Sequence, residues 1–480
     1  MYLPPIFFTL LLLINSILCY NPLNRYLHNS IIIDNRLLIL GGFTNTTGSY
    51  ELFYLNLLKP FDNNNLTWTL IPEGNLTVYV YRSTSILSTD NSTIYLIGGV
   101  KMNQNGYYDF SNPFYTYNYP TSKWDTPKII GNGVPIRQSI EGVIDNFGII
   151  YLFGGYNVTN FTDFTGELYN DIYSFNTVSM AWTTLSTSGD IPKPCSGYSA
   201  NILPNGYIVY IGGVEPNALN INFTLVKINN IKLFNTKSYK WSQMNAIGDI
   251  VDSRTSHNSI LTPDGHIIIF GGRTQEYTSV SPILALLDTN TYPYEWSIPG
   301  GASFNSPPSI YGSTANLYYN YMIITFGRNI NTLEYNSKVY LYDIKSNTWV
   351  TSFVPTNTLT TNNSTNINDS STNTTNSSKS LAIGLGFTIA AIIIIISCIA
   401  IFIIYRRKKR EEMMKKKEAI ANEEETGERD IETGERDIET EESDIETQTN
   451  EGSESGAPPN PPNPPPNPSD NRLFRILIFI

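Results

Sequence analysis

Cysteine and histidine are scarce in this chain of 480 residues, which contains only three of each. Cys19 and Cys398 belong to two strongly apolar blocks, so Cys195 has no partner in the long region between those blocks. A disulfide framework and a Cys/His metal site are therefore excluded there. Burial of apolar surface must hold this region together, and roughly 330 residues are enough for a sizeable core.

Extended positive charge is also lacking, because 31 Lys and Arg stand against 42 Asp and Glu, for a net charge of −11. A nucleic-acid partner is excluded, since nothing basic and extended is available to neutralise phosphates. What the central region does contain is Tyr, Asn, Thr, Ile and Gly, with little Glu, Lys or Ala. This composition is typical of strands joined by turns.

The two apolar blocks predict targeting and a membrane anchor. Ile6–Leu18 is too short to cross a bilayer and indicates a signal peptide over residues 1–20. Leu381–Tyr405 carries no charge and is long enough for a transmembrane helix. The cluster Arg406–Arg410 follows at once and marks the cytoplasmic side. We therefore expect a single-pass protein of the plasma membrane or another secretory-pathway membrane, with its N-terminus outside.

Sequons for N-glycosylation agree with an extracellular or luminal central region. Residues 355–380 are rich in Ser, Thr and Asn and predict a stalk without a core. The candidate acceptors in the central region are Asn45, Asn65, Asn75, Asn91, Asn157, Asn160 and Asn222.

An internal repeat organises residues 21–354. A short run of strand-forming residues ends in a diglycine five times, and a sixth, degenerate copy ends in Gly327-Arg328. The first glycines of successive copies are 56 to 59 residues apart. Such a period indicates a repeat architecture. The glycines are Gly41, Gly42, Gly98, Gly99, Gly154, Gly155, Gly212, Gly213, Gly271, Gly272 and Gly327.

Two further markers share this register. One tryptophan follows each first glycine by 22 to 29 residues, and an arginine precedes four of the glycines by 16 or 17 residues. Cys195 and Ile310 stand at the arginine place of the fourth and sixth repeats. The tryptophans are Trp68, Trp124, Trp182, Trp241, Trp296 and Trp349, and the arginines are Arg25, Arg82, Arg137 and Arg254.

These runs, diglycines and tryptophans resemble the kelch repeat family, and more loosely the propeller of galactose-oxidase-like proteins, over roughly residues 24–354. The resemblance implies an all-β fold, a six-bladed kelch-type β-propeller with four strands per blade. One transmembrane α-helix and a disordered tail would follow it. We interpret the glycines and tryptophans as scaffold, for tight turns and for packing between blades.

Residues with catalytic potential are few. A copper radical oxidase of galactose-oxidase type would need two histidines and a tyrosine crosslinked to a cysteine, but His28, His257 and Cys195 occupy ordinary repeat positions, and His266 follows a turn glycine. No nucleophile elbow, phosphate-binding glycine loop or HExxH motif occurs. We therefore predict no catalytic, cofactor-binding or metal site.

The tail, residues 406–480, predicts disorder. A basic start is followed by an acidic seven-residue repeat at Glu425–Ile431 and Glu432–Ile438, with too few apolar residues for a coiled coil. Pro458–Pro468 favours polyproline II and fits either an SH3 or WW partner or a plain spacer.

The function that these features favour is non-enzymatic recognition or adhesion at the cell surface, with a protein or glycan ligand at the propeller loops. The copper oxidase and a structural wall-to-membrane tether are the alternatives. A propeller by itself does not identify a ligand, because this fold serves many unrelated functions.

Overall fold

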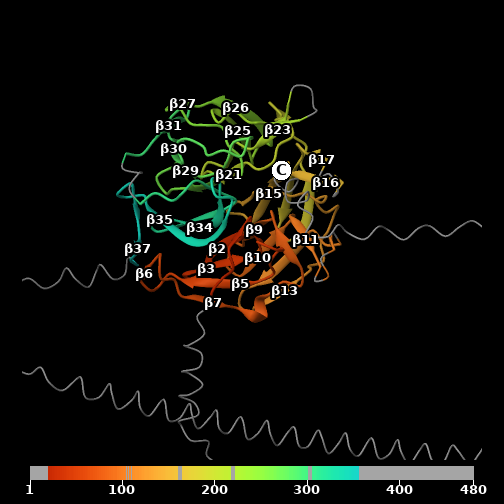
Figure 1. The fold of residues 1–480 in the computed structure, drawn as a ribbon. Coiled ribbons are helices and arrows are strands. Elements are labelled where there is room, and N and C mark those ends of the chain that lie inside the picture. Colours follow the sequence, from red (N-terminus) through yellow and green to blue (C-terminus); the bar gives the residue numbers. More distant parts are fainter. Residues whose placement is uncertain are drawn as a thin grey trace, which may run out of the picture. The chain divides into compact units, whose positions relative to one another are not determined.

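The repeats fold into antiparallel sheets arranged around a central axis (Figure 1). The computed structural model describes residues 20–355 except positions 104, 106, 110, 161–164, 218–221 and 301–304. The predicted signal segment up to residue 19, the stalk from 356, the transmembrane segment and the tail with its proline-rich stretch lie outside the described residues.

Five repeats form regular sheets, each a meander of four antiparallel strands. The first three consist of β2 (Asn29–Ile33), β3 (Arg36–Leu40), β5 (Leu52–Asn56) and β7 (Trp68–Leu70); β9 (Thr84–Leu87), β10 (Thr93–Ile97), β12 (Phe114–Asn118) and β13 (Lys123–Asp125); and β14 (Gly142–Ile144), β15 (Ile149–Phe153), β18 (Ile172–Asn176) and β19 (Ala181–Thr184).

The fourth and fifth repeats add one short parallel edge strand to the meander. They consist of β21 (Ser199–Ile202), β22 (Tyr207–Ile211), β25 (Asn230–Asn235), β26 (Lys240–Asn245) and the edge strand β20 (Ser188–Gly189); and of β28 (Asn258–Leu261), β29 (His266–Phe270), β30 (Leu284–Asp288), β31 (Glu295–Ser297) and the edge strand β27 (Ile247–Gly248).

The sixth repeat departs from the predicted blade. Its meander belongs to a seven-stranded sheet that also takes in two strands from the N-terminal part of the chain. The structure therefore shows five regular four-stranded blades rather than the six that the sequence predicts, because β34 and β35 extend beyond the sixth meander and pair there with other strands. The sheet contains β33 (Thr314–Tyr318), β34 (Tyr321–Asn329), β35 (Tyr335–Asp343), β36 (Thr348–Val350), β32 (Ile310–Tyr311), β1 (Arg25–Tyr26) and β4 (Phe43–Thr44).

A closed circle of backbone hydrogen bonds links all six repeats. One residue just before the innermost strand of each repeat donates its N–H to the carbonyl of its counterpart in the preceding repeat, at 2.6 to 3.1 Å, and Leu27 donates to Gly312. All six have a positive φ between 54° and 64°. The innermost strands follow the same order, and β33 contacts β2. The six residues are Leu27, Arg82, Ser139, Gly197, Ser256 and Gly312.

Apolar clusters fill the six spaces between neighbouring repeats. The second strand of each meander reads as a continuous apolar run, as in Leu37–Leu40, because neighbouring blades cover both of its faces. Each repeat tryptophan packs into the cluster shared with the preceding repeat; Trp296, for example, is 1% exposed.

The diglycines turn the chain away from this core. Gly41 has φ +63°, and a Cβ at this position would lie 2.5 Å from the Val80 carbonyl oxygen of the next repeat. Only glycine tolerates that combination of conformation and closeness.

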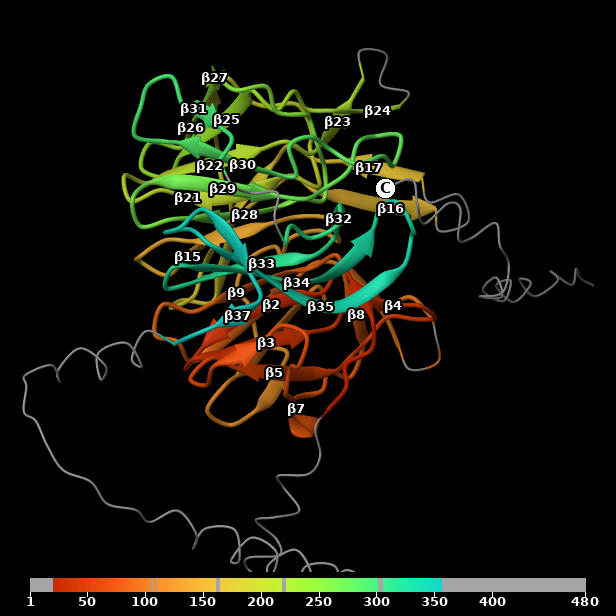
Figure 2. The ribbon, with the colours of Figure 1, turned by 60° about the vertical axis from the view of Figure 1, so that its left-hand side comes forward.

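Short hairpins project beyond the blades after several diglycines. In Figure 2 they gather at one end of the strands, on the right-hand side together with β4. They pair β8 (Tyr79–Tyr81) with β11 (Val100–Met102), β16 (Tyr156–Asn160) with β17 (Thr165–Leu168), and β23 (Val214–Pro216) with β24 (Phe223–Leu225).

The first and last parts of the described chain are joined. β37 (Ser352–Phe353) pairs with β6 (Phe61–Asp62), and Phe353 stacks on Phe61 at 4.8 Å. Tyr20, inside the expected signal segment, forms a backbone bridge to Trp68. A 3-10 turn, η1 (Pro72–Gly74), follows β7. In residues 20–355, leaving aside the gaps, we find no helix with the length and apolarity to cross a bilayer.

Candidate functional site

Three of the four predicted repeat arginines are buried scaffold residues. Each donates an Nη1–H to the carbonyl of its own first glycine, at 2.9 Å for Arg25, 2.7 Å for Arg137 and 3.1 Å for Arg254. The left-handed turn at the diglycine leaves this buried oxygen without a strand partner, and a buried acceptor needs a donor.

Other side chains fill the same role in the remaining repeats. Lys101 Nζ donates to the Gly98 carbonyl at 2.8 Å, Asn336 Nδ2 to Gly327 at 3.1 Å, and the Cys195 thiol lies 3.9 Å from the Gly212 carbonyl oxygen. Lys101 and Asn336 come from strands after the diglycine rather than before it. Sequence spacing therefore gave no signal for these two donors.

Arg82 is not a repeat arginine, so its prediction as one needs correction. The residue of the second repeat that matches Arg25 is Val80, whose carbonyl lies against Gly41 as that of Arg137 lies against Gly98. Arg82 belongs instead to the circle of hydrogen-bonded turn residues, and its Nη1 donates to Ser139 Oγ at 3.3 Å. It is a half-buried cation at the central channel.

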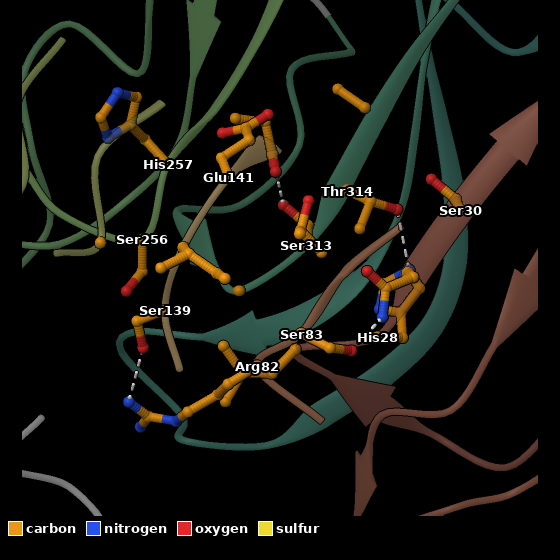
Figure 3. A pocket seen from close by; sticks show the side chains of 18 of the residues that line it. His28, Ser30, Arg82, Ser83, Ser139, Glu141, Ser256, His257, Ser313 and Thr314 are labelled. Atoms are coloured by element: carbon orange, nitrogen blue, oxygen red, sulfur yellow. Dashed lines mark hydrogen bonds between the residues drawn. The ribbon is translucent and has the colours of Figure 1, made fainter. Parts of the chain in front are cut away.

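The channel contains a cavity of about 190 Å³ that is lined by all six repeats (Figure 3). Hydroxyl groups dominate the lining, which also holds Arg82, Glu141, His28, His257 and Tyr198. The hydroxyl residues are Ser30, Ser83, Thr84, Ser85, Ser139, Ser256, Ser259, Ser313 and Thr314.

At least one polar side chain bridges each pair of neighbouring repeats at this level. Asn29 donates to Ser83, Asn258 donates to Ser313, and Thr84 accepts from the Gly142 N–H. Ser199 and Thr314 bond to the histidines of the following repeats, and the sixth repeat thereby reaches the first. In the third repeat the bridging residue is Glu141, which accepts from the Ala200 N–H at 3.3 Å.

The two cavity histidines are neutral bridging groups. Nε2 of His28 lies 2.9 Å from Thr314 Oγ1, and Nε2 of His257 lies 3.0 Å from Ser199 Oγ. Burial, and next the charge of Arg254, lower the pKa of His257 to about 3. Burial likewise holds the pKa of His28 well below its usual value. Neither imidazole is charged near neutral pH.

A cluster of arginines and tyrosines adjoins the cavity at Arg82, and we call this cluster the mouth. Arg273 lies 3.7 Å from the ring centre of Tyr277, and Arg328 lies 5.2 Å from that of Tyr335. Arg328 Nη1 also donates to the Tyr311 hydroxyl at 3.0 Å. The mouth consists of Arg82, Arg273, Arg328, Tyr26, Tyr277, Tyr311 and Tyr335.

The charges of all three mouth arginines affect the pKa of one tyrosine, Tyr277. Burial raises the pKa of Tyr277, and the charges of Arg273, Arg82 and Arg328 oppose that rise. Across the described residues, none of the three arginines forms an ion pair with a carboxylate. Arg273 is only 5% exposed, and burial lowers its pKa. A buried guanidinium without a counter-charge is costly, so the mouth is electrostatically suited to a negatively charged group.

The residues considered for oxidase chemistry serve other contacts. His266 faces the carboxylates of Asp264 and Asp288 at the opposite end of the strands, and Cys195 is buried beside Lys232. Within the part of the chain that the structure describes, no group of three His, Cys, Asp or Glu side chains is placed to hold a metal ion.

The predicted glycosylation sites differ in exposure. Asn45, Asn65, Asn91 and Asn222 are exposed. Asn75 and Asn157 are half-buried: Asn75 Oδ1 accepts from the Leu52 N–H, and Asn157 Nδ2 donates to the Tyr169 hydroxyl. The Asn160 side chain lies outside the described part of the structure.

Comparison with known proteins agrees with this architecture. The family described as the KLHDC2/KLHL20/DRC7 Kelch-repeats domain matches residues 16–213 and 221–381. Kelch domain-containing protein 3 of Rattus norvegicus is 26% identical over 257 residues, which are 52% of this chain and 64% of that protein. The Rho GTPase-activating protein gacHH of Dictyostelium discoideum is 30% identical over 121 residues, 25% of this chain and 7% of that protein.

A solved structure shows the same fold. The structure of YjhT superimposes with a TM-score of 0.50 at 14% identity and covers 69% of this chain and 98% of its own. The chain spans less than two thirds of the length of the curated relatives named above.

Proposed function

The chain belongs to the kelch-repeat family, and from this premise we propose that its propeller is a non-enzymatic recognition module that binds a protein partner at the mouth. Kelch propellers typically bind protein partners. The observation that carries the choice of surface is the set of three guanidinium groups, Arg82, Arg273 and Arg328, without a carboxylate partner among the described residues.

The partner group that suits the mouth is acidic. Arg273 has five N–H donors, and its hydrogen bond among the described residues is the one from Nη1 to the Thr274 carbonyl. The tyrosines around it are suited to a protein contact, because Tyr and Arg are enriched at the energetic centres of interfaces. A carboxylate of the partner would receive charge-assisted hydrogen bonds, which are about twice as strong as neutral ones.

Photo-crosslinking from two ends of the propeller tests the choice of surface. In one variant a photoreactive phenylalanine replaces Leu333, whose carbonyl accepts from Arg328 Nε. In the other it replaces Tyr292, which is 86% exposed in the turn between β30 and β31, at the end of the strands opposite the mouth. We expect crosslinks to one protein partner from position 333 and not from position 292. The same partner captured only from position 292 would move the site to the other end and contradict the proposal.

We also propose that the sixth repeat acts as the sixth blade of a closed ring. The circle of hydrogen bonds through Leu27 and Gly312 and the Thr314–His28 bridge support this. Hydrogen exchange that leaves the Leu27 amide unprotected while the Ser256 amide is protected would contradict it.

We further propose that the propeller stands outside the cell or in the secretory lumen, anchored through Leu381–Tyr405. The sequence supports this through the apolar length of that segment and the basic cluster that follows it. Recovery of the full chain in the soluble fraction after alkaline extraction of membranes would exclude such an anchor.

A further inference from the structure

Among the described residues that line the central cavity, Glu141 is the one carboxylic acid. The residues that bridge the repeats at the same level elsewhere carry amides or hydroxyls, as Asn29 and Thr84 do. The Thr84 hydroxyl accepts a backbone N–H of the following repeat as Glu141 does, and the Asn258 amide instead donates to Ser313 of the following repeat. The bridging role therefore does not require an acid, and the carboxyl group of Glu141 is unexplained by the scaffold.

Among the described residues, no cationic side chain forms an ion pair with Glu141. Protein surrounds its side chain, and the part that remains accessible lines the cavity. Its recorded hydrogen bond is the one from the Ala200 N–H. Burial raises the pKa of Glu141 to about 8, with a smaller opposing effect of that bond. The other titratable lining residues are Arg82, which donates to Ser139, the neutral His28 and His257, and Tyr198, whose hydroxyl donates to the Phe153 carbonyl.

The cavity also offers oriented hydroxyl oxygens. Four serines of the lining each accept an N–H from an asparagine of a neighbouring repeat, at 2.7 Å for Ser83 and 2.6 Å for Ser313. A serine hydroxyl that accepts one hydrogen bond keeps a further lone pair and its own O–H. The four are Ser30, Ser83, Ser259 and Ser313.

We propose that the central cavity binds a small primary ammonium ion, with the Glu141 carboxylate as its counter-charge and serine hydroxyls as further acceptors. An ammonium group has three N–H donors and no acceptor, which suits one carboxylate among hydroxyl oxygens. A single water needs roughly 10–15 Å³ of such space, so 190 Å³ leaves room for a short carbon chain. A metal ion fits less well, because the described residues supply no cluster of three suitable ligands.

Binding must release a proton near neutral pH. The unoccupied carboxyl group is mostly protonated at pH 7, and the ammonium ion pairs with the carboxylate, so the proton leaves to the buffer as the ion pair forms. The affinity should therefore be at least about tenfold higher at pH 8 than at pH 6. The proposal is separate from protein binding at the mouth, because Glu141 and the four serines are not mouth residues; Arg82 belongs to both the cavity lining and the mouth.

Calorimetric titration of the full chain with ethylammonium chloride tests this, in two buffers of different ionisation enthalpy. We expect binding with nearly one proton released per site at pH 7. Glu141→Gln should weaken binding by at least about tenfold, because the charge-assisted pair is lost while the amide oxygen still accepts from Ala200. Glu167→Gln, at an exposed position on β17, should change nothing.

Three results would overturn the proposal: no heat of binding up to ~10 mM ethylammonium, binding without proton release, or equal binding by the Glu141→Gln chain. Parallel titrations with potassium and calcium chloride separate the sources of positive charge. Binding of calcium but not of ethylammonium would make this a metal site and contradict the assignment. If Glu141→Gln failed to fold, the number of protons that the unaltered chain releases on binding ethylammonium would still show whether the carboxyl group takes part.

Discussion

At the scale of single residues, the propeller depends on side chains that satisfy the first glycine carbonyl of each repeat. Arg25, Arg137 and Arg254 do this from before the diglycine, and Lys101 and Asn336 do it from behind. An arginine that donates to a buried glycine carbonyl, such as Arg137, belongs to the scaffold. Arg82, which donates to Ser139 instead, lines the channel.

Arg137 and Arg82 should therefore differ in their effect on stability. Arg137→Ala leaves the Gly154 carbonyl without its 2.7 Å donor and Asp171 without its 2.6 Å partner. We expect a loss of roughly 2–5 kcal/mol in the free energy of unfolding. Arg82→Ala should cost less than about 1 kcal/mol, because only one bond to a serine is lost. Urea denaturation measures both, and equal losses would contradict the assignment of Arg82 to the channel.

Glu141 makes stability depend on pH. Its pKa is about 8 in the folded chain and near the ordinary 4.5 in the unfolded chain, so the folded state binds the proton more tightly. This contribution is complete below pH 4.5 and is lost as the pH rises through 8. We expect the free energy of unfolding of Glu141→Gln to fall less between pH 5 and pH 8 than that of the unaltered chain.

Urea denaturation at pH 5, 6.5 and 8 measures this difference, with Glu167→Gln as the control at an exposed site. Parallel pH profiles for the unaltered chain and Glu141→Gln would show that burial does not protonate the carboxyl group.

Residue roles were only partly predictable from the sequence. The tryptophans and the diglycines recur at a regular spacing, because core packing imposes the repeat. Arg82 was misassigned because it stands 16 residues before Gly98, the same distance as Arg25 before Gly41. The connection between the first two blade strands is longer in the second repeat (β9 to β10) than in the first (β2 to β3), and residue spacing alone does not reveal this. Glu141 gave no signal, since its burial depends on the closed ring.

At the scale of elements, the first and last repeats are held together by short strands. β37 pairs with β6, and β1 pairs with β35. Phe353 is 1% exposed and belongs to the apolar cluster shared by the first and sixth repeats. The join between the ends of the chain therefore relies on packing as well as on strand pairing.

Phe353→Ala should open this join. We expect a loss of roughly 3–5 kcal/mol, because a large buried ring is removed from a closed apolar cluster. Val354→Ala is the matched control, since Val354 is 40% exposed next to it. Thermal unfolding compares the two variants. A similarly small effect of both would mean that the ring holds without β37.

The four-strand meanders follow from alternating apolar and turn residues, and they were predictable. The short strands β1, β4, β32 and β37 were not, because two-residue strands carry no periodicity. Their pairing depends on which parts of the chain the closed ring brings together, and this explains why the seven-stranded sheet was missed.

In the whole molecule, the mouth and the hairpins β8/β11, β16/β17 and β23/β24 lie at one end of the blade strands. The turns between the first and second strands of the meanders lie at the other end. Arg36 lies beside the β2–β3 turn at that far end, over the ring of Tyr54 at 4.7 Å. Arg36 and Tyr54 therefore form an arginine–tyrosine pair away from the mouth, which makes Arg36 a suitable control position.

Glycan mapping by mass spectrometry tests the proposed extracellular placement. When the chain is expressed in a eukaryotic host, it should carry glycans at the exposed Asn45, Asn65, Asn91 and Asn222. Asn157 should remain unmodified, because its Nδ2 donates to Tyr169. A chain without any glycan at the four exposed sites would contradict passage through the secretory pathway.

Binding at the mouth is tested by the dissociation constant of the crosslinked partner for three forms of the full chain: unaltered, Arg82→Ala and Arg36→Ala. We predict at least about tenfold weaker binding for Arg82→Ala and no change for Arg36→Ala, because only Arg82 belongs to the mouth. Equal affinity of Arg82→Ala and the unaltered chain, or a loss confined to Arg36→Ala, would show that the partner does not bind at the mouth.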